Sequence, residues 1–313
     1  MAQKQRVTLI HNPTAGDEDH SKAHLLRLIR NAGYEAAYKS SKEDFASALE
    51  DPGDLVIVAG GDGTVRKVAL ELLDSNVPLA ILPMGTANNI SKSLGMTGTT
   101  EELVDTWSSA QAKEFRIGTA KSPWGHEPFI EAVGLGLLSK AISILDKVDQ
   151  KADIDFANTE HKVSRDLTAL IMLLSEYTPM DLKVIIDGRE ISEPLLLFEI
   201  MNIECVGPNM LLAPDADPSD DYLDCVFLSE RNRENFATYL TALIAGKEGT
   251  LPVEIVRGKN IEFHWEGTAI HLDDKIWTKG LTVPSPPQVI EVALDGRRFR
   301  YLSMDNPTKK KRA

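Results

Sequence analysis

Short runs rich in β-branched and apolar residues alternate with helical stretches over the first hundred residues. The runs lie at residues 7–10, 34–38, 55–59 and 79–82, and each predicts a strand. The 3.6-residue periodicity of residues 20–31 and 65–73 predicts helices, and Ser41 with Asp44 predicts a helix N-cap. Because strands that are apolar on both faces need cover on both faces, we expect a parallel sheet flanked by helices.

After about residue 112 the strands alternate between apolar and polar positions. Residues 182–186 precede the turn pair Asp187-Gly188, and residues 261–265 precede Glu266-Gly267, so each pair predicts an antiparallel hairpin. Two helices are expected within this region, at residues 137–148 and 162–175. The pattern predicts a predominantly β unit, a sandwich, with helices attached.

These patterns predict an α/β domain at residues 1–112 and a β-sandwich domain at residues 113–295. The segment 296–308 is expected to return to the first domain, and residues 309–313 form a basic tail. That tail is either a solvated segment or a site of transient contact with an anionic membrane surface.

Composition narrows the classes of partner. The chain of 313 residues is 42% hydrophobic and 26% charged, which is typical of a globular protein with a core. Its formal net charge of -13 repels phosphate backbones, so we expect no nucleic-acid partner. No apolar run approaches the roughly 20 residues that cross a bilayer, and polar residues follow Met1, so we expect a cytoplasmic protein. The pattern leaves the oligomeric state open.

A glycine-rich segment connects the predicted strand 55–59 with the helix 65–73. It consists of Gly60, Gly61, Asp62, Gly63 and Thr64. Backbone N–H groups and the helix dipole at such a connection attract phosphate. A carboxylate there would repel phosphate unless it served a metal ion or a ribose hydroxyl, which makes Asp62 a candidate for one of these contacts.

Two similar connections follow other predicted strands. Gly85, Thr86 and Asn88 come after the strand 79–82, and Asn12 comes after the strand 7–10. Because the carboxyl ends of parallel strands meet at one edge of a sheet, the three connections predict a common phosphate-binding site.

The Asn-Pro-x-x-Gly opening, the Gly-Gly-Asp-Gly-Thr segment and the later Pro-x-Gly-Thr-x-Asn segment resemble the diacylglycerol kinase catalytic domain, which bacterial lipid kinases and sphingosine kinases share. The resemblance implies a Rossmann-like nucleotide domain and a β-sandwich, with ATP and Mg²⁺ as cofactors and a lipid or other hydrophobic alcohol as acceptor. It implies that Asp273 is the catalytic base, with Asp295 as a competing match. It also implies a structural magnesium at Asp217, Asp220 and Asp224.

Departures from the family pattern leave two alternatives to an active lipid kinase. Asn89 and Lys275 stand where the family has carboxylates, so the chain could bind nucleotide without turnover. NAD kinases share the glycine-rich segment, so an NAD kinase-like activity is a further alternative.

Overall fold

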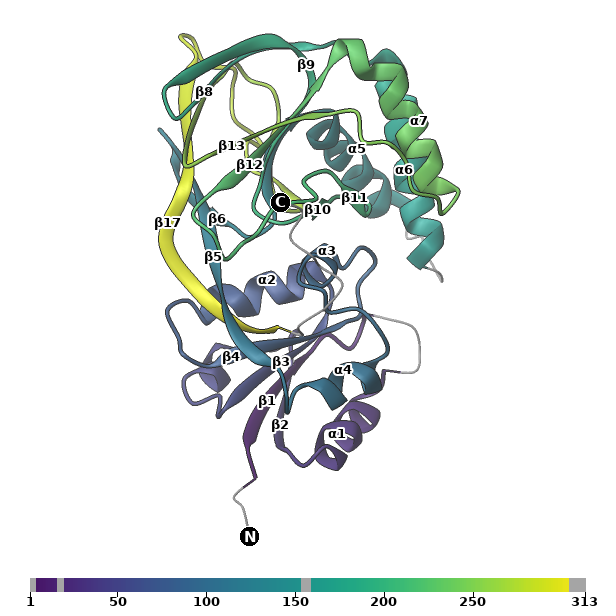
Figure 1. The fold of residues 1–313 in the computed structure, drawn as a ribbon, viewed down its shortest axis with the longest axis vertical. Coiled ribbons are helices and arrows are strands. Elements are labelled where there is room, and N and C mark those ends of the chain that lie inside the picture. The colour runs from purple at the N-terminus through teal and green to yellow at the C-terminus, as the bar shows by residue number, and fades with distance from the viewer. Residues whose placement is uncertain (1–3, 16–19, 153–158, 304–313) are drawn as a thin grey trace. The chain divides into compact units, whose positions relative to one another are not determined.

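The computed structural model describes residues 4–15, 20–152 and 159–303 (Figure 1). The chain divides into two compact units, of which the first takes the residues up to Phe115 and those from Arg297 on, and the second runs from Arg116 to Gly296. The predicted basic tail at residues 309–313 lies outside the described residues. None of the helices in the described parts of the chain is long and apolar enough to span a membrane.

The first unit is built on a parallel sheet. Its strands are β1 (Arg6–His11), β2 (Glu35–Ser40), β3 (Leu55–Gly60), β4 (Pro78–Pro83) and the last residues of β17 (Gln288–Ser303). They lie in the order β2-β1-β3-β4-β17, and all neighbours are parallel. Val56, Ile57 and Val58 are each 0% exposed, so side chains on both faces of β3 are covered. The prediction of a parallel sheet buried on both sides is therefore confirmed.

Short helices follow β1, β3 and β4. They are α1 (Lys22–Asn31), α2 (Asp62–Glu71), α3 (Asn89–Ser93) and α4 (Thr100–Thr106). The hydroxyl of Ser21 accepts a hydrogen bond from the His24 amide and starts α1, whose Leu25 and Ile29 are buried. The helix cap predicted at Ser41 and Asp44 is wrong. Asp44 closes a local turn by accepting the Ala46 amide, and only the 3₁₀ turn η1 (Ala46–Leu49) follows.

The second unit is mainly antiparallel. Its strands are β5 (Gln111–Ser122), which begins in the first unit, β6 (Gly125–Phe129), β7 (Ala132–Gly136), β8 (Met180–Ile186), β9 (Arg189–Met201), β12 (Leu223–Ser229), β13 (Glu254–Gly258), β14 (Asn260–Trp265), β15 (Ile270–Leu272), β16 (Lys275–Ile276) and the start of β17, with β10 (Cys205–Val206) and β11 (Met210–Leu211) as a separate pair. The first half of β9 pairs with β8, and its second half lies between β7 and β12. Val133 and Leu135 on β7 enter one hydrophobic core, whereas Ala132 enters another, so the sheet separates two cores. The predicted β-sandwich is confirmed.

One of the two predicted hairpins forms. Asp187 and Gly188 have φ of 47° and 81°, the left-handed backbone that a tight two-residue turn requires, and β8 pairs with β9 across them. The hairpin predicted at Glu266-Gly267 is wrong, because β14 pairs with β8 and β17, whereas β15 pairs with β7 and β16.

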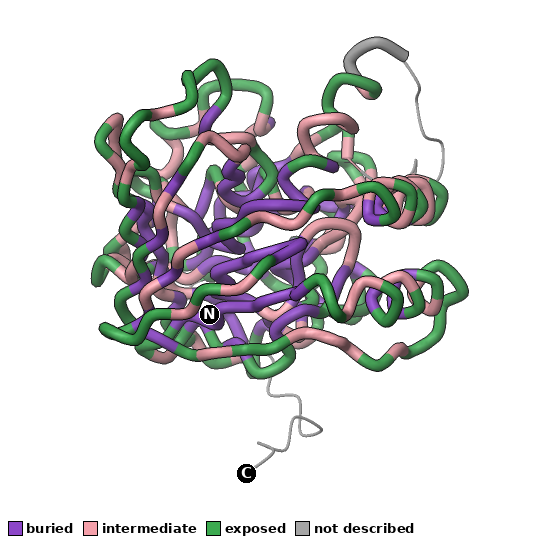
Figure 2. Tube along the Cα trace, turned by 90° about the horizontal axis from the view of Figure 1, so that it is seen from above, coloured by how far each residue is buried: buried purple, intermediate pink, exposed green. Residues whose placement is uncertain are grey.

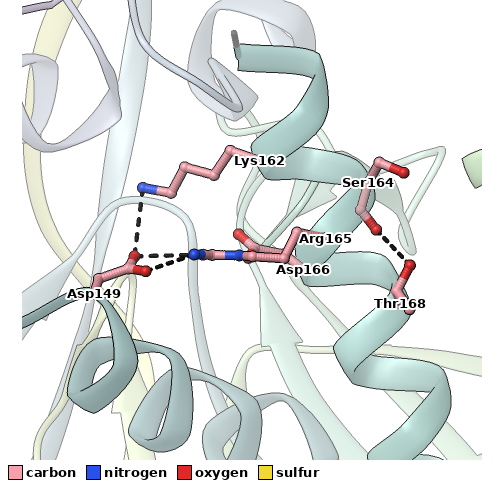
Figure 3. A network of polar contacts seen from close by, with 6 residues as sticks. All are labelled: Asp149, Lys162, Ser164, Arg165, Asp166 and Thr168. Atoms are coloured by element: carbon pink, nitrogen blue, oxygen red, sulfur yellow. Dashed lines mark hydrogen bonds and ion pairs between the residues drawn. The ribbon is translucent and has the colours of Figure 1, made fainter. Parts of the chain in front are cut away.

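Three helices cover one core of this unit: α5 (Leu137–Ala152), α6 (Thr159–Glu176) and α7 (Arg233–Ile244). The first two were predicted, and α6 packs against both others (Figure 1). Arg165 on α6 donates a 2.6 Å hydrogen bond to Asp149 on α5, and Lys162 lies 3.8 Å from the same carboxylate (Figure 3).

Buried residues gather along the strands, while exposed ones lie on outer helix faces and turns (Figure 2).

Candidate functional site

The glycine-rich segment of the first unit is almost entirely strand and helix. β3 ends at Gly60, Gly61 is the N-cap, and α2 begins at Asp62. The helix predicted at residues 65–73 therefore starts three residues earlier, and Asp62, Gly63 and Thr64 form its first turn. The first backbone N–H groups of a helix point outward along its axis and attract anions, so this turn can bind phosphate.

The Asp62 carboxylate holds the connection after β4. Its Oδ2 accepts the Asn89 amide and its Oδ1 accepts the Ile90 amide, each at 3.0 Å. These two amides open the short helix α3. Asp62 thus joins the first turn of α2 to the beginning of α3, a contact between two protein segments that the linear motif did not indicate.

Glycines let the same two connections touch through their backbones. A Cβ on Gly85 would lie 2.4 Å from the Gly61 Cα, closer than any side chain tolerates. Asn88, at φ 53°, closes the turn after β4, because its Oδ1 accepts the Gly85 amide at 2.8 Å and its Nδ2 donates to the Gly85 carbonyl at 2.7 Å. The Asn88 side chain therefore shapes the turn, while Thr86 is partly exposed beside it.

The first connection is tied to β3 as well. The Asn12 amide donates to the Ala59 carbonyl at 2.8 Å, and the Asn12 Oδ1 accepts the Thr14 hydroxyl at 3.0 Å. His11, next to it, is 3% exposed, and burial lowers the pKa of its imidazole. The carboxyl ends of β1, β3 and β4 thus bring all the predicted nucleotide-binding residues to one edge of the first unit, where ligands bind in sheets of this kind.

Asp273, the predicted base, lies in the second unit and is buried, with 4% of its surface exposed. Its Oδ1 accepts the amides of Ile130, Glu131 and Ala132 at 3.1, 2.7 and 3.3 Å. A backbone cage of this kind orients a carboxylate tightly. The competing residue, Asp295, lies on β17 and accepts a hydrogen bond from the Thr119 hydroxyl.

The three residues predicted to hold structural magnesium have protein partners instead. Asp217 accepts the Ser219 amide and hydroxyl at 2.9 and 2.6 Å. The Arg257 guanidinium pairs with Asp220 and also lies 3.7 Å from the Asp224 carboxylate. Asp224 is 3% exposed, and burial outweighs Arg257 and raises the pKa of its carboxyl to about 6.

Magnesium binds clustered, ionised oxygen ligands, commonly six of them. Across the described residues, no group of three or more His, Cys, Asp or Glu side chains is arranged to hold a metal ion. With the Arg257 guanidinium beside both Asp220 and Asp224, and Asp217 bonded to Ser219, the three residues do not fit a magnesium site.

One polar group in the core of the second unit was not predicted from the sequence. Glu199 and His271 are each 0% exposed, and their Oε2 and Nε2 atoms lie 3.2 Å apart. The signal that could have identified it is an acidic residue inside a continuously apolar strand, since Glu199 interrupts the buried run of β9.

Comparisons with known proteins agree over nearly the whole chain. The diacylglycerol kinase catalytic domain family matches residues 6–120, and the family described as YegS C-terminal NAD kinase beta sandwich-like domain matches residues 147–293. A diacylglycerol kinase of Bacillus subtilis is 27% identical over 256 residues, 78% of this chain and 80% of that protein. One of Mycobacterium tuberculosis is 23% identical over 311 residues, 95% and 96% of the two chains.

A solved structure has the same fold. The crystal structure of a diacylglycerol kinase from Bacillus anthracis superimposes with a TM-score of 0.64 at 21% sequence identity. The superposition covers 97% of this chain and 99% of that one, so both units have counterparts in it.

Proposed function

Because the chain is similar to diacylglycerol kinases over both units, we propose that it transfers the γ-phosphoryl group of ATP to a hydroxyl group of diacylglycerol or a similar lipid. The observation that carries this proposal is the interlocked pair of strand-to-helix connections in the first unit. Gly61 and Gly85 touch through their backbones, and Asp62 bonds both connections together, at the edge of a parallel sheet where nucleotides bind.

In this proposal the nucleotide phosphates contact the first turn of α2 and the turn closed by Asn88. Helix-terminal N–H groups offset phosphate charge, and glycines allow the backbone to come within hydrogen-bond distance. The remaining predicted contacts, Asn12, Thr64 and Thr86, lie at the same edge. The nucleotide is taken as its magnesium complex, and no role in it is assigned to Asp217, Asp220 or Asp224.

Asp273 is proposed as the base that accepts the proton of the lipid hydroxyl. The three amides on its Oδ1 fix the direction of the carboxyl group, which suits a group that must meet a hydroxyl at hydrogen-bond distance. Phosphoryl transfer relies mainly on in-line positioning and charge neutralisation. The orientation of the base therefore contributes more to the rate than its basicity does.

The test is phosphoryl transfer by the purified full chain, with γ-labelled ATP, Mg²⁺ and diacylglycerol in mixed micelles. Label is expected in the lipid and is expected to disappear in Asp273→Asn, while Asp295→Asn retains it. Loss of label in Asp295→Asn alone would assign the base to Asp295 instead.

The same assay separates the alternatives. Label that enters NAD in place of lipid would show an NAD kinase-like activity. ATP binding measured by calorimetry, without transfer to either acceptor, would show a nucleotide-binding protein without turnover and refute the proposed lipid kinase.

A further inference from the structure

Ser139, His271 and Glu199 form a polar chain inside the second unit, and each is 0% exposed. The Ser139 Oγ lies 2.8 Å from the His271 Nδ1, and the His271 Nε2 lies 3.2 Å from the Glu199 Oε2. Strand register brings the last two together, because His271 on β15 and Glu199 on β9 both pair with Gly134 on β7. A Cβ at residue 134 would lie 1.9 Å from the Glu199 Oε2, so glycine provides the space in which they meet.

The hydrogen bonds define where the protons lie. The Ser139 hydroxyl donates to the Gly134 carbonyl at 2.9 Å, so its oxygen accepts the proton on the His271 Nδ1. The Nε2 of a neutral imidazole is then an acceptor that faces Glu199. Burial raises the pKa of Glu199, which favours a protonated carboxyl that can donate to this nitrogen.

A contribution to folding stability does not explain why Ser139, His271 and Glu199 are buried together. Within the described residues, neither Glu199 carboxyl oxygen has a hydrogen-bond partner of good geometry, which is costly in a core. Replacing a buried polar pair with apolar residues of similar size is often neutral or stabilising. The three side chains are therefore better explained by the position that they give to a neighbouring segment.

The three side chains meet at β15, the strand that directly precedes Asp273. β15 is only three residues long, and Asp273 follows it directly with φ 50°, an unfavourable backbone for a residue with a side chain. The Asp273 amide donates to the Ala132 carbonyl at 2.8 Å, and the amides that cage its carboxylate enter β7. The Ser139 hydroxyl joins His271 on β15 to the Gly134 carbonyl on β7, and His271 also faces Glu199 on β9, so the three side chains connect β15 to both β7 and β9.

We propose that Ser139, His271 and Glu199 are positioning residues that hold β15 against β7 and thereby fix the direction of the Asp273 carboxyl group. This inference rests on the proposed function, in which Asp273 is the base. None of the three touches substrate, and they act through the position of Asp273.

The decisive variant is the double substitution Glu199→Leu with His271→Leu, which removes the acid and the imidazole together, while the Ser139 hydroxyl keeps its hydrogen bond to the Gly134 carbonyl. Its kcat is expected to fall about 10- to 100-fold, the loss that a small misplacement of a catalytic group causes. The KM for ATP should not change, because the nucleotide-binding residues lie in the other unit, and the urea midpoint should equal or exceed that of the wild type. A double variant with wild-type kcat would overturn the proposal.

Two single variants sharpen this result. Glu199→Gln keeps a donor toward the His271 Nε2, so it should retain most of the wild-type kcat. Val226→Ala removes buried apolar volume opposite Glu199 on β12 and serves as the control for loosened packing. If Val226→Ala lowered kcat as much as the double variant, the effect would be one of packing and the proposal would be wrong.

Hydrogen exchange provides a readout that needs no activity. The amides of Ile130, Glu131 and Ala132, which bond to Asp273, should exchange faster in the double variant but not in Val226→Ala. If the wild type transfers no phosphate, the proposed function fails, and these amides still decide whether the chain positions Asp273. Unchanged exchange at all three would overturn the inference whatever the activity.

Discussion

Removing the Asp62 carboxylate is expected to loosen the connection after β4 and, through it, ATP binding. Asp62→Ala deletes two hydrogen bonds of 3.0 Å from the amides of Asn89 and Ile90. A hydrogen bond to a charged group contributes about 1.5–3 kcal/mol, and Asp62 is only partly buried, so the lower end applies to each. The expected loss in the free energy of unfolding is therefore about 3 kcal/mol.

Asp62→Asn retains one acceptor oxygen, so about half of that loss is expected from it. Asp187→Ala is a matched control, because Asp187 also accepts two backbone amides, those of Lys259 and Asn260, but lies in the second unit. Its effect on ATP affinity should be negligible.

The measurements are hydrogen exchange at the Asn89 and Ile90 amides, urea unfolding, and calorimetric titration with ATP and Mg²⁺. Faster exchange at both amides should accompany a drop in ATP affinity in Asp62→Ala. If affinity fell while the two amides exchanged as in the wild type, Asp62 would act on the nucleotide directly, and the reasoning from loop geometry would be refuted.

Two further predictions concern packing and pH. Gly85→Ala should destabilise the protein by about 1–3 kcal/mol and abolish ATP binding, because its Cβ would meet the Gly61 backbone. Gly33→Ala is the control, since Gly33 has φ 96° and open space around it, and it should lose only the stability that backbone strain costs. Urea unfolding and ATP calorimetry compare the two variants. The raised pKa of Asp224, about 6, favours the folded protein while the carboxyl is protonated, and this stabilisation is lost as the pH rises through 6. Asp224→Asn should therefore match the wild type near pH 3.8 and exceed it by roughly 3 kcal/mol at pH 7.5, and equal urea midpoints at both pH values would contradict this.

The sheet of the first unit could be predicted from the sequence because its strands are covered on both faces. An apolar run such as residues 55–59 has few other structures open to it, and β3 extends it by one residue. The turn Asp187-Gly188 was predictable for a similar local reason, since both residues adopt the left-handed backbone easily.

Strand partners in the second unit were not predictable in this way. The pattern of residues 261–265 indicated a strand correctly, but its neighbours β8 and β17 are set by packing between distant segments. The helix α7 was not predicted, although Phe236, Tyr239 and Leu240 have helical spacing and are buried. In the site, motifs identified Asp62 and Asp273, but their hydrogen-bond partners lie 27 and 142 residues away in sequence.

The geometry around these two carboxylates favours an active kinase over one that has lost turnover. Asn89 supplies Asp62 with a backbone amide, which any residue other than proline provides, so an amide side chain there leaves the Asp62 contacts intact. Lys275 is exposed and pairs with Leu272 through the backbone, while the cage around Asp273 comes from Ile130–Ala132. The changes at Asn89 and Lys275 therefore alter side chains near Asp62 and Asp273 and leave the hydrogen bonds of these two carboxylates unchanged. Asn89→Asp and Lys275→Glu should therefore alter the rate of lipid phosphorylation by much less than Asp273→Asn does, and a change as large as that of Asp273→Asn would contradict this.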